Sequence, residues 1–297
     1  MRMSRRTVLA GTAGALVAKS ARPMRLAVCS ETFAGMSFRE ACRAANRTGY
    51  EGIEIEPANL SGDPAGLSAG ERRELKRTIS DAGLRYVGLH SVLKSPPGLH
   101  LTTADEVVRA KSWEYFGRLI ELAADLGERP VVVLGSGRQR AAEGAVKSSE
   151  AVARIEEGLR RVAPAAEKRG AAILLEPLAP HLCNVLNTLA ETAAIVRSIG
   201  SPAVRTMFDA HNTAAEKQSP AELLRAYFPY IGHVHLNEMD GRYPGAGDYP
   251  FQEVLQALKD LDYGGWISVE VFDFNPDGET VARKAREYLR RVEEKLR

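Results

Sequence analysis

The chain has 297 residues, of which 44% are hydrophobic and 26% are charged, and its formal net charge is +2. This composition is ordinary for a globular protein and excludes a largely disordered chain, while the lack of any run of about 18 uncharged apolar residues excludes a membrane span in the body of the chain. Because a single α/β barrel commonly reaches about 250 residues, one domain can account for nearly the whole length.

The first 22 residues differ from the rest. Arg5 and Arg6 precede a weakly apolar run rich in Gly and Ala, and Ala18 and Ser20 are spaced like a signal-peptidase site. Residues 1–22 resemble a bacterial twin-arginine export signal, which predicts export to the periplasm; the alternative is a disordered basic tail on a cytoplasmic protein. Loss of the leader's five basic side chains changes the formal charge from +2 to −3. Such a body is a poor partner for nucleic acid.

Short β-branched, apolar runs then alternate with longer amphipathic segments about eight times. This alternation is typical of βαβ units and predicts a parallel sheet whose strands are buried on both faces. The predicted strands are Leu26 to Cys29, Gly52 to Ile55, Tyr86 to Leu89, Val131 to Leu134, Ala172 to Leu175, Val204 to Phe208, Ile231 to His235 and Ile267 to Val271.

Local signals mark the helices between these strands. Capping boxes predict helix starts after Ser37, Ser68, Thr103, Thr188 and Ser219. Left-handed glycines are expected to end helices at Gly49, Gly83, Gly127, Gly170 and Gly200, and a last helix is expected from about Asp277 to Arg297. Eight strands and eight helices predict a (β/α)₈ TIM barrel over residues 23–297. An open doubly wound sheet is the alternative, but residues 30–33 lack its Gly-rich phosphate loop.

The three cysteines, Cys29, Cys42 and Cys183, show no C-x-x-C spacing and are odd in number. We therefore expect buried free thiols and no disulfide framework or thiolate metal cluster.

The last four predicted strands each end in a polar residue: Glu176, Asp209, His235 and Glu270, which are spaced by 33, 26 and 35 residues. In a parallel barrel all strands point their carboxyl ends at one rim, so these side chains should converge there. Three crowded carboxylates repel one another unless they bind protons or cations. The pattern therefore predicts one divalent metal ion; oxygen-rich ligation favours Mn²⁺, with Co²⁺, Mg²⁺ and Zn²⁺ left open.

Several short motifs surround the four strand-end residues: Leu175-Glu176-Pro177-Leu178, Asn187-Thr188, Phe208-Asp209-Ala210-His211-Asn212, Gly232-His233-Val234-His235, Pro244-Gly245-Ala246-Gly247 and Tyr263-Gly264-Gly265-Trp266-Ile267-Ser268-Val269-Glu270. These motifs resemble the xylose-isomerase-like sugar isomerase and epimerase superfamily, particularly ketose 3-epimerases of the tagatose and allulose type. The resemblance implies that the four strand-end residues hold the metal, and that Glu176 and Glu270 also exchange the substrate proton through a metal-stabilised enediolate.

Other polar residues near strand ends are candidates for substrate binding: His211, Asn212, Arg242, His90 and Glu56. Arg140, after the fourth strand, could also face the pocket. We expect His233 to point away from the barrel interior. The expected partner is a small sugar, with no nucleic acid, no membrane once the leader is removed, and a homo-oligomer left open.

The chain also departs from the ketose 3-epimerase pattern. Those enzymes commonly carry a carboxylate near the position of Leu182, and often a histidine at that of Asn212. The sequence therefore predicts a sugar epimerase or an aldose-ketose isomerase without naming the sugar. The first alternative is a metal-dependent lyase or hydrolase of keto-sugars or glycosides on the same barrel. The second is an abasic-site endonuclease, which the formal charge of −3 without the leader disfavours. The third is an inactive binding module, which the presence of all four potential ligands disfavours.

Overall fold

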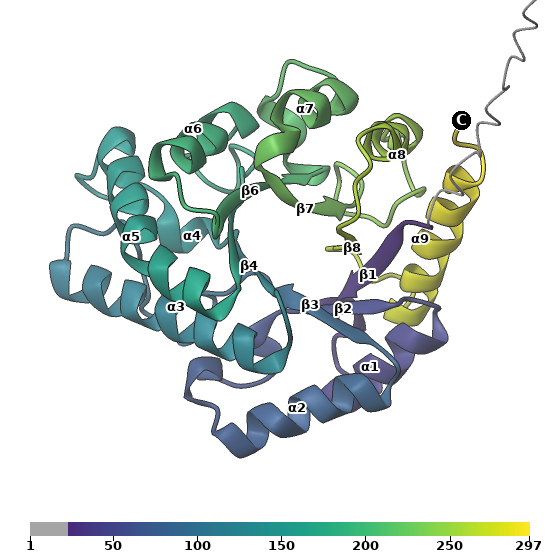
Figure 1. Cartoon of the computed structure of the whole chain (residues 1–297), viewed down its shortest axis with the longest axis horizontal. Coiled ribbons are helices and arrows are strands. Elements are labelled where there is room, and N and C mark those ends of the chain that lie inside the picture. The colour runs from purple at the N-terminus through teal and green to yellow at the C-terminus, as the bar shows by residue number, and fades with distance from the viewer. Residues whose placement is uncertain (1–22) are drawn as a thin grey trace, which may run out of the picture.

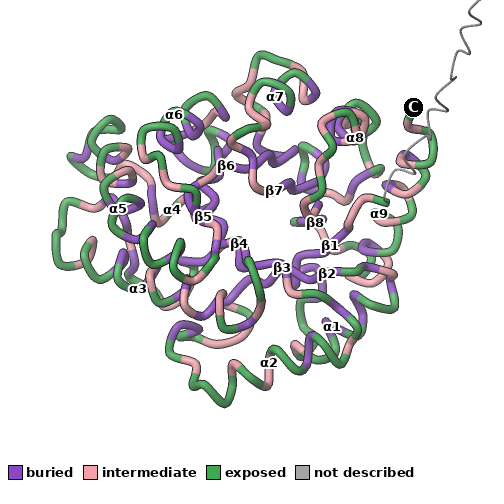
Figure 2. The backbone as a smooth tube through the Cα atoms, in the orientation of Figure 1, coloured by how far each residue is buried: buried purple, intermediate pink, exposed green. Residues whose placement is uncertain are grey.

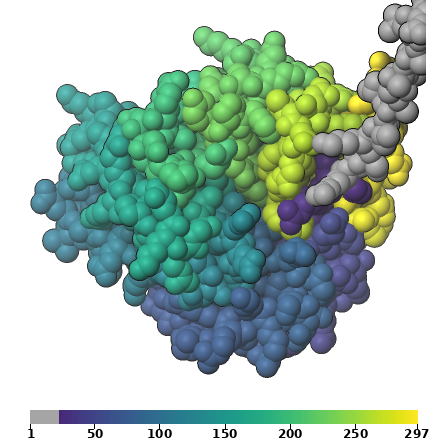
Figure 3. Space-filling view, viewed as in Figure 1, coloured from purple at the N-terminus to yellow at the C-terminus, as the bar shows by residue number. Residues whose placement is uncertain are grey.

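The computed structural model describes residues 23–297, in which eight parallel strands close into a barrel surrounded by helices (Figure 1). Strands adjacent in the chain are adjacent in the barrel, and β1 closes it by pairing with β8. The successive units follow one another around the surface in chain order (Figure 3). The predicted TIM barrel is confirmed, whereas the predicted leader lies outside the described residues.

All eight strands lie within two residues of their predicted bounds. The central residues of the strands are buried because one face of each strand points into the barrel interior and the other packs against the helices. The strands are β1 (Arg25–Cys29), β2 (Gly52–Ile55), β3 (Arg85–Leu89), β4 (Val131–Leu134), β5 (Ala172–Leu175), β6 (Val204–Asp209), β7 (Ile231–Leu236) and β8 (Trp266–Val269).

The described residues form nine α-helices rather than the eight expected, because a short helix, α4, follows β4 before the long α5. None of the helices in residues 23–297 is long and apolar enough to cross a membrane. The helices are α1 (Phe38–Arg47), α2 (Ala69–Asp81), α3 (Glu106–Leu126), α4 (Gly137–Arg140), α5 (Ser148–Arg169), α6 (Leu189–Ile199), α7 (Pro220–Tyr227), α8 (Phe251–Asp260) and α9 (Gly278–Glu293).

Two of the predicted helix-end features are wrong, although α3 does end at Gly127 as predicted. The capping box at Thr103 does not form; Asp105, directly before α3, accepts hydrogen bonds from Val107 N and Val108 N instead. Gly127 has φ −170°, which is extended rather than left-handed. The remaining boxes form at Ser37, Ser68, Thr188 and Ser219, and positive φ angles occur at Gly49, Gly83, Gly170 and Gly200.

The main apolar core lies between the helices and the outer face of the barrel, as the buried strands and exposed outer helix faces in Figure 2 indicate. A second, small apolar cluster, Val133, Leu174 and Met207, comes from β4, β5 and β6. The three cysteines are buried and free, as expected.

Candidate metal centre

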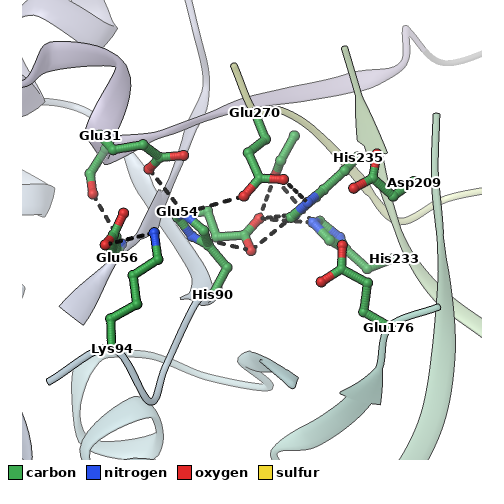
Figure 4. Close-up of polar contacts among 12 residues, drawn as sticks. Glu31, Glu54, Glu56, His90, Lys94, Glu176, Asp209, His233, His235 and Glu270 are labelled. Atoms are coloured by element: carbon green, nitrogen blue, oxygen red, sulfur yellow. Dashed lines mark hydrogen bonds and ion pairs between the residues drawn. The ribbon is translucent and has the colours of Figure 1, made fainter. Parts of the chain in front are cut away.

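The structure brings together the four residues predicted as metal ligands. Glu176 follows β5, Asp209 ends β6, His235 lies near the end of β7 and Glu270 follows β8. One potential ligand atom from each of the four lies within 4.8 Å of the others, and all four residues are buried. Figure 4 shows the side chains of these four residues close to one another.

The pleat of the strands aims these side chains inward. Successive side chains along a strand point to opposite faces, so residues two apart share a face. Leu174 and Met207 belong to the small apolar cluster, and the residues two positions further along are Glu176 and Asp209. Glu176 also needs a glycine beside it: a Cβ atom on Gly135 would lie 1.7 Å from Glu176 Oε2. The close approach of β4's end to this carboxylate therefore excludes a side chain at position 135.

Electrostatics at this cluster favours a bound cation. Burial raises the pKa of Glu176 well above its usual value, and repulsion from Asp209 and Glu270 raises it further. Burial, with repulsion from Glu270, also raises the pKa of Asp209. Burial acts in the same direction on Glu270, but His235 outweighs it and lowers the pKa of that carboxyl. Two of the three acids are thus poorly compensated by the protein itself.

The donor set fits a divalent ion. Within residues 23–297, no Lys, Arg or His nitrogen lies within 4.0 Å of a carboxylate oxygen of Glu176 or Asp209, whereas Glu270 Oε2 lies 3.1 Å from His235 Nδ1. Three carboxylates and one imidazole suit Mn²⁺, Co²⁺ or Mg²⁺, and they also accept Zn²⁺. A divalent ion would replace the protons that burial and repulsion otherwise force onto this cluster.

A second layer of polar side chains lies behind His235, and the sequence analysis missed its central member. Glu54, on β2, is fully buried and lies 2.9 Å from His233 Nε2 and 3.2 Å from His235 Nε2. Burial alone would raise the pKa of Glu54, but the two histidines outweigh it and hold the pKa well below its usual value. A charged residue inside the otherwise apolar Gly-Ile-Glu-Ile strand was the signal that could have identified it.

The predicted orientation of His233 is wrong. Because side chains two positions apart on a strand share a face, His233 points into the barrel together with His235. Its Nε2 atom lies 2.9 Å from Glu54 Oε2 and 3.1 Å from Ser268 Oγ.

Asn212 and His211, both predicted to bind substrate, lie in the 3₁₀ turn η4 (His211–Ala215) directly after β6. Asn212 Nδ2 donates to Asp209 Oδ2 at 2.7 Å and to Glu176 Oε1 at 3.2 Å, so it bridges two of the proposed ligands. The ring of His211 makes an edge contact with Phe272, at 5.1 Å between centroids. Contact of either residue with substrate stays a prediction.

The other candidates come from the β2 and β3 ends and from loops. His90 Nε2 lies 2.9 Å from Glu31 Oε2 and 3.8 Å from Glu270 Oε1, so His90 reaches the edge of the metal centre. Its pKa is raised to about 9 because Glu31, with Glu54 and Glu270, outweighs the lowering effect of burial. Glu56 forms an ion pair of 3.0 Å with Lys94 (Figure 4).

Two arginines have distinct surroundings. Arg242 is half-buried and its Nε donates to Asp240 Oδ2 at 2.7 Å. Arg140 is fully buried; it donates to the backbone carbonyl oxygens of Leu134, at 2.9 Å, and of Glu176, at 2.6 Å. It therefore fixes the backbone that carries Glu176 rather than offering its charge to a ligand.

Comparison with known proteins agrees with this architecture. Residues 42–292 match the model of the family described as xylose isomerase-like TIM barrel. A D-psicose 3-epimerase of Agrobacterium fabrum is 31% identical over 227 residues, which cover 76% of each chain. A solved D-psicose 3-epimerase with D-fructose has a TM-score of 0.80 at 24% identity, covering 91% of this chain and 99% of the other. A 3-keto-D-glucoside 4-epimerase from E. coli has a TM-score of 0.78 at 20% identity, covering 91% and 100%. The two structural similarities demonstrate the shared fold.

Proposed function

This chain belongs to the xylose isomerase-like TIM barrel family, and we propose that it is a divalent-metal-dependent epimerase of a ketose or a related keto-sugar. Its similarity to a D-psicose 3-epimerase places it among isomerase-class enzymes. The observation that carries the metal-dependent chemistry is the convergence of Glu176, Asp209, His235 and Glu270, three of them acids, within one buried cluster. A small sugar is accordingly the proposed partner.

These four residues would hold the ion, for which Mn²⁺ is the favoured candidate. When bound, such an ion supplies positive charge that stabilises the negative charge developing on the oxygens of a keto-sugar as a carbon-bound proton leaves. Asn212 keeps Asp209 and Glu176 oriented through its two hydrogen bonds. The four side chains emerge from rigid strand ends, which favours a fixed ligand geometry.

Glu176 and Glu270 would exchange the proton. They follow β5 and β8, which are not neighbours in the barrel, so the two carboxylates approach the site from separate directions. One carboxylate removes the proton from carbon on one face of the sugar, and the other returns a proton to the opposite face. Inversion at that carbon gives the epimer. Removal of a proton from C1 of the ketose, followed by return of a proton to C2, would instead be aldose-ketose isomerisation.

Product analysis in deuterated water tests this function. The purified enzyme is incubated with Mn²⁺ and single ketoses, and the products are identified by NMR spectroscopy. We expect an epimer that carries deuterium at the inverted carbon, because the returned proton comes from a carboxylate in exchange with solvent. An epimer formed without solvent deuterium would contradict the two-carboxylate mechanism and indicate a hydride shift.

A second candidate function is cleavage of keto-glycosides on the same barrel, by lyase or hydrolase chemistry. Large exposed apolar side chains in the loops after β5, β7 and β8 favour a substrate larger than a free sugar; these are Leu182, Met239 and Phe272. Products from one keto-sugar and one keto-glycoside distinguish the two functions: the epimerase inverts a carbon and leaves the glycosidic bond intact, whereas the alternative releases the aglycone.

We also propose that residues 1–22 direct export to the periplasm. The proposal rests on the sequence Ser4-Arg5-Arg6-Thr7-Val8-Leu9 and the weakly apolar run that follows it. Fractionation of cells that express the full chain, and a variant with Arg5 and Arg6 both changed to Lys, tests it. Full-chain protein that stays in the cytoplasm of a host with twin-arginine export would contradict it.

A further inference from the structure

Glu54 is the buried acid whose role the proposed function leaves open. It is fully buried in β2, and it is not one of the four residues of the candidate metal centre. Both of its carboxylate oxygens nevertheless lie 3.2 Å from Nε2 of His235, the imidazole of that centre. In Figure 4, Glu54 is at the middle of the contacts that join the two histidines of β7 to the rest of the site.

The two ring nitrogens of His235 face different partners. Nδ1 faces the metal centre and lies 3.1 Å from Glu270 Oε2, whereas Nε2 faces Glu54. A neutral imidazole has one N–H donor and one lone-pair acceptor, and an ionised carboxylate can only accept. A hydrogen bond to Glu54 therefore requires the proton on Nε2. This tautomer leaves the lone pair of Nδ1 free for a metal ion.

Other side chains hold the Glu54 carboxylate in place. Ser268 Oγ donates to Glu54 Oε2 at 2.6 Å, and His233 Nε2 lies 2.9 Å from the same oxygen. His233 lies two residues before His235 on β7, and Ser268 of β8 lies two residues before Glu270, which directly follows that strand. The same two segments therefore supply both proposed ligands and the layer behind them. These two side chains fix the position of the carboxylate that faces His235, so that Glu54 has three partners in all.

We propose that Glu54 is a positioning residue that locks His235 in the tautomer and ring orientation needed to bind a divalent metal ion through Nδ1. The proposal rests on the metal centre of the proposed function. In this role Glu54 acts through His235, to which it is hydrogen-bonded. Partners of metal-binding histidines typically change metal affinity by about 10- to 100-fold when they are replaced.

The test is the variant Glu54→Gln, studied in the otherwise complete protein. Glutamine keeps the volume of the side chain, but its amide N–H can donate to Nε2 and so favours the proton on Nδ1, the tautomer that cannot bind metal. We expect isothermal titration calorimetry to give a dissociation constant for Mn²⁺ about 10- to 100-fold higher than in the unsubstituted protein. The visible spectrum of the Co²⁺-loaded variant should also change, because this spectrum reports the ligand set.

Glu56→Gln is the matched control. This variant also removes one negative charge, at a position two residues after Glu54. Glu56, however, pairs with Lys94 rather than with His235. Its Mn²⁺ affinity and Co²⁺ spectrum should stay close to those of the unsubstituted protein. An equal loss of affinity in both variants would attribute the effect to charge alone and overturn the proposal.

Ser268→Ala covers the case in which Glu54→Gln does not fold. It removes one of three donors to Glu54 and should weaken Mn²⁺ binding by about fivefold, the value of one net hydrogen bond. Unchanged affinity in Glu54→Gln or, where that variant does not fold, in Ser268→Ala overturns the proposal. Failure of the unsubstituted protein to bind Mn²⁺ is a different result, because it removes the proposed metal centre itself.

Discussion

Two groups of acids at the carboxyl end of the barrel differ in how the protein neutralises them. The acids contributed by β2 and by the segments beside it have basic partners within 3.0 Å: Glu31 with His90, Glu54 with His233, and Glu56 with Lys94. The acids after β5 and at the end of β6, Glu176 and Asp209, have no such partner in residues 23–297. The first group has basic side chains beside it, whereas the second requires protons or an added cation to offset the repulsion between its carboxylates. This difference indicates where a metal ion would bind.

The largest expected effect comes from Glu176→Gln and Glu270→Gln. Each variant keeps an oxygen donor and most of the volume but removes a base, so turnover should fall by about 10² to 10⁴, the usual contribution of a positioned acid or base. Metal affinity should weaken less. Steady-state kinetics measures the first effect and calorimetry the second.

A single Gln substitution should also leave proton exchange alive on one face of the sugar, visible as deuterium uptake without epimerisation. Near-normal turnover in both variants would show that neither carboxylate is catalytic. The difference between the acids with and without a basic partner would then have no consequence for catalysis.

The next effect concerns pH and metal removal. In metal-free protein the pKa values of Glu176, His235 and His90 are raised, that of His90 to about 9. A raised folded-state pKa gives stability that is lost as pH rises from the ordinary pKa to the folded-state pKa. For His90 this window runs from pH 6.5 to about 9, and there the metal-free protein should lose on the order of 1–3 kcal/mol of unfolding free energy. The loss from Glu176 begins lower, near pH 4.5. The acids with lowered pKa values titrate at lower pH and do not oppose this trend.

Bound metal should reduce that loss, because it replaces the protons on Glu176 and His235. Urea unfolding of chelator-treated and Mn²⁺-loaded protein at several pH values provides the measurement. Equal pH dependence with and without metal would argue that the cluster binds no ion.

A smaller effect, on substrate binding, is expected from Glu56→Gln, which changes one of the acids that has a basic partner. If Glu56 accepts a hydrogen bond from a substrate hydroxyl, the loss of its charge should raise KM by roughly tenfold and leave the Mn²⁺ affinity unchanged. Its partner Lys94 is half exposed, so Lys94→Met is a useful comparison that leaves the carboxylate in place. A KM unchanged in Glu56→Gln would remove this residue from the substrate site.

The smallest effect should follow from removing residues 1–22. The first strand begins at Arg25, and the proposed ligands all lie in the body of the chain. Residues 1–22 contain five basic side chains and no acid, so their deletion also tests whether the leader supplies the cation that Glu176 and Asp209 lack. Mn²⁺ affinity and thermal stability should match those of the full chain; a large change in either would show that the leader contributes to the barrel or its site.

Much of the fold could be predicted because its signals are local. The apolar runs predicted the strands to within two residues, and polar residues at four strand ends predicted the cluster of Glu176, Asp209, His235 and Glu270. Where a nearer side chain competes, local signals fail: Asp105, adjacent to α3, displaces the capping box of Thr103. Gly127 likewise shows that a glycine after a helix need not be left-handed.

The surroundings of the cluster were harder to predict because they depend on contacts between distant strands. Glu54 meets His233 and His235 across 179 and 181 residues of sequence, and nothing near Glu54 indicates those partners. Glu56 was predicted as a site residue instead, because it directly follows the end of β2. The inward direction of His233 could have been predicted, because residues 233 and 235 lie two positions apart on β7 and so share a face. The hydrogen bonds of Asn212 depend on the turn η4, which has no distinctive sequence pattern.

Metal content tests the central claim most directly. The protein is purified without chelator, supplied with Mn²⁺ and freed of excess metal by gel filtration, and its metal content is then measured by inductively coupled plasma mass spectrometry. The double variant Glu176→Gln with Asp209→Asn, in which both uncompensated acids lose their charge, is measured in the same way. We predict close to one divalent ion per chain in the unsubstituted protein and little in the variant. A fully active enzyme without bound metal, or equal metal content in both proteins, would contradict the account.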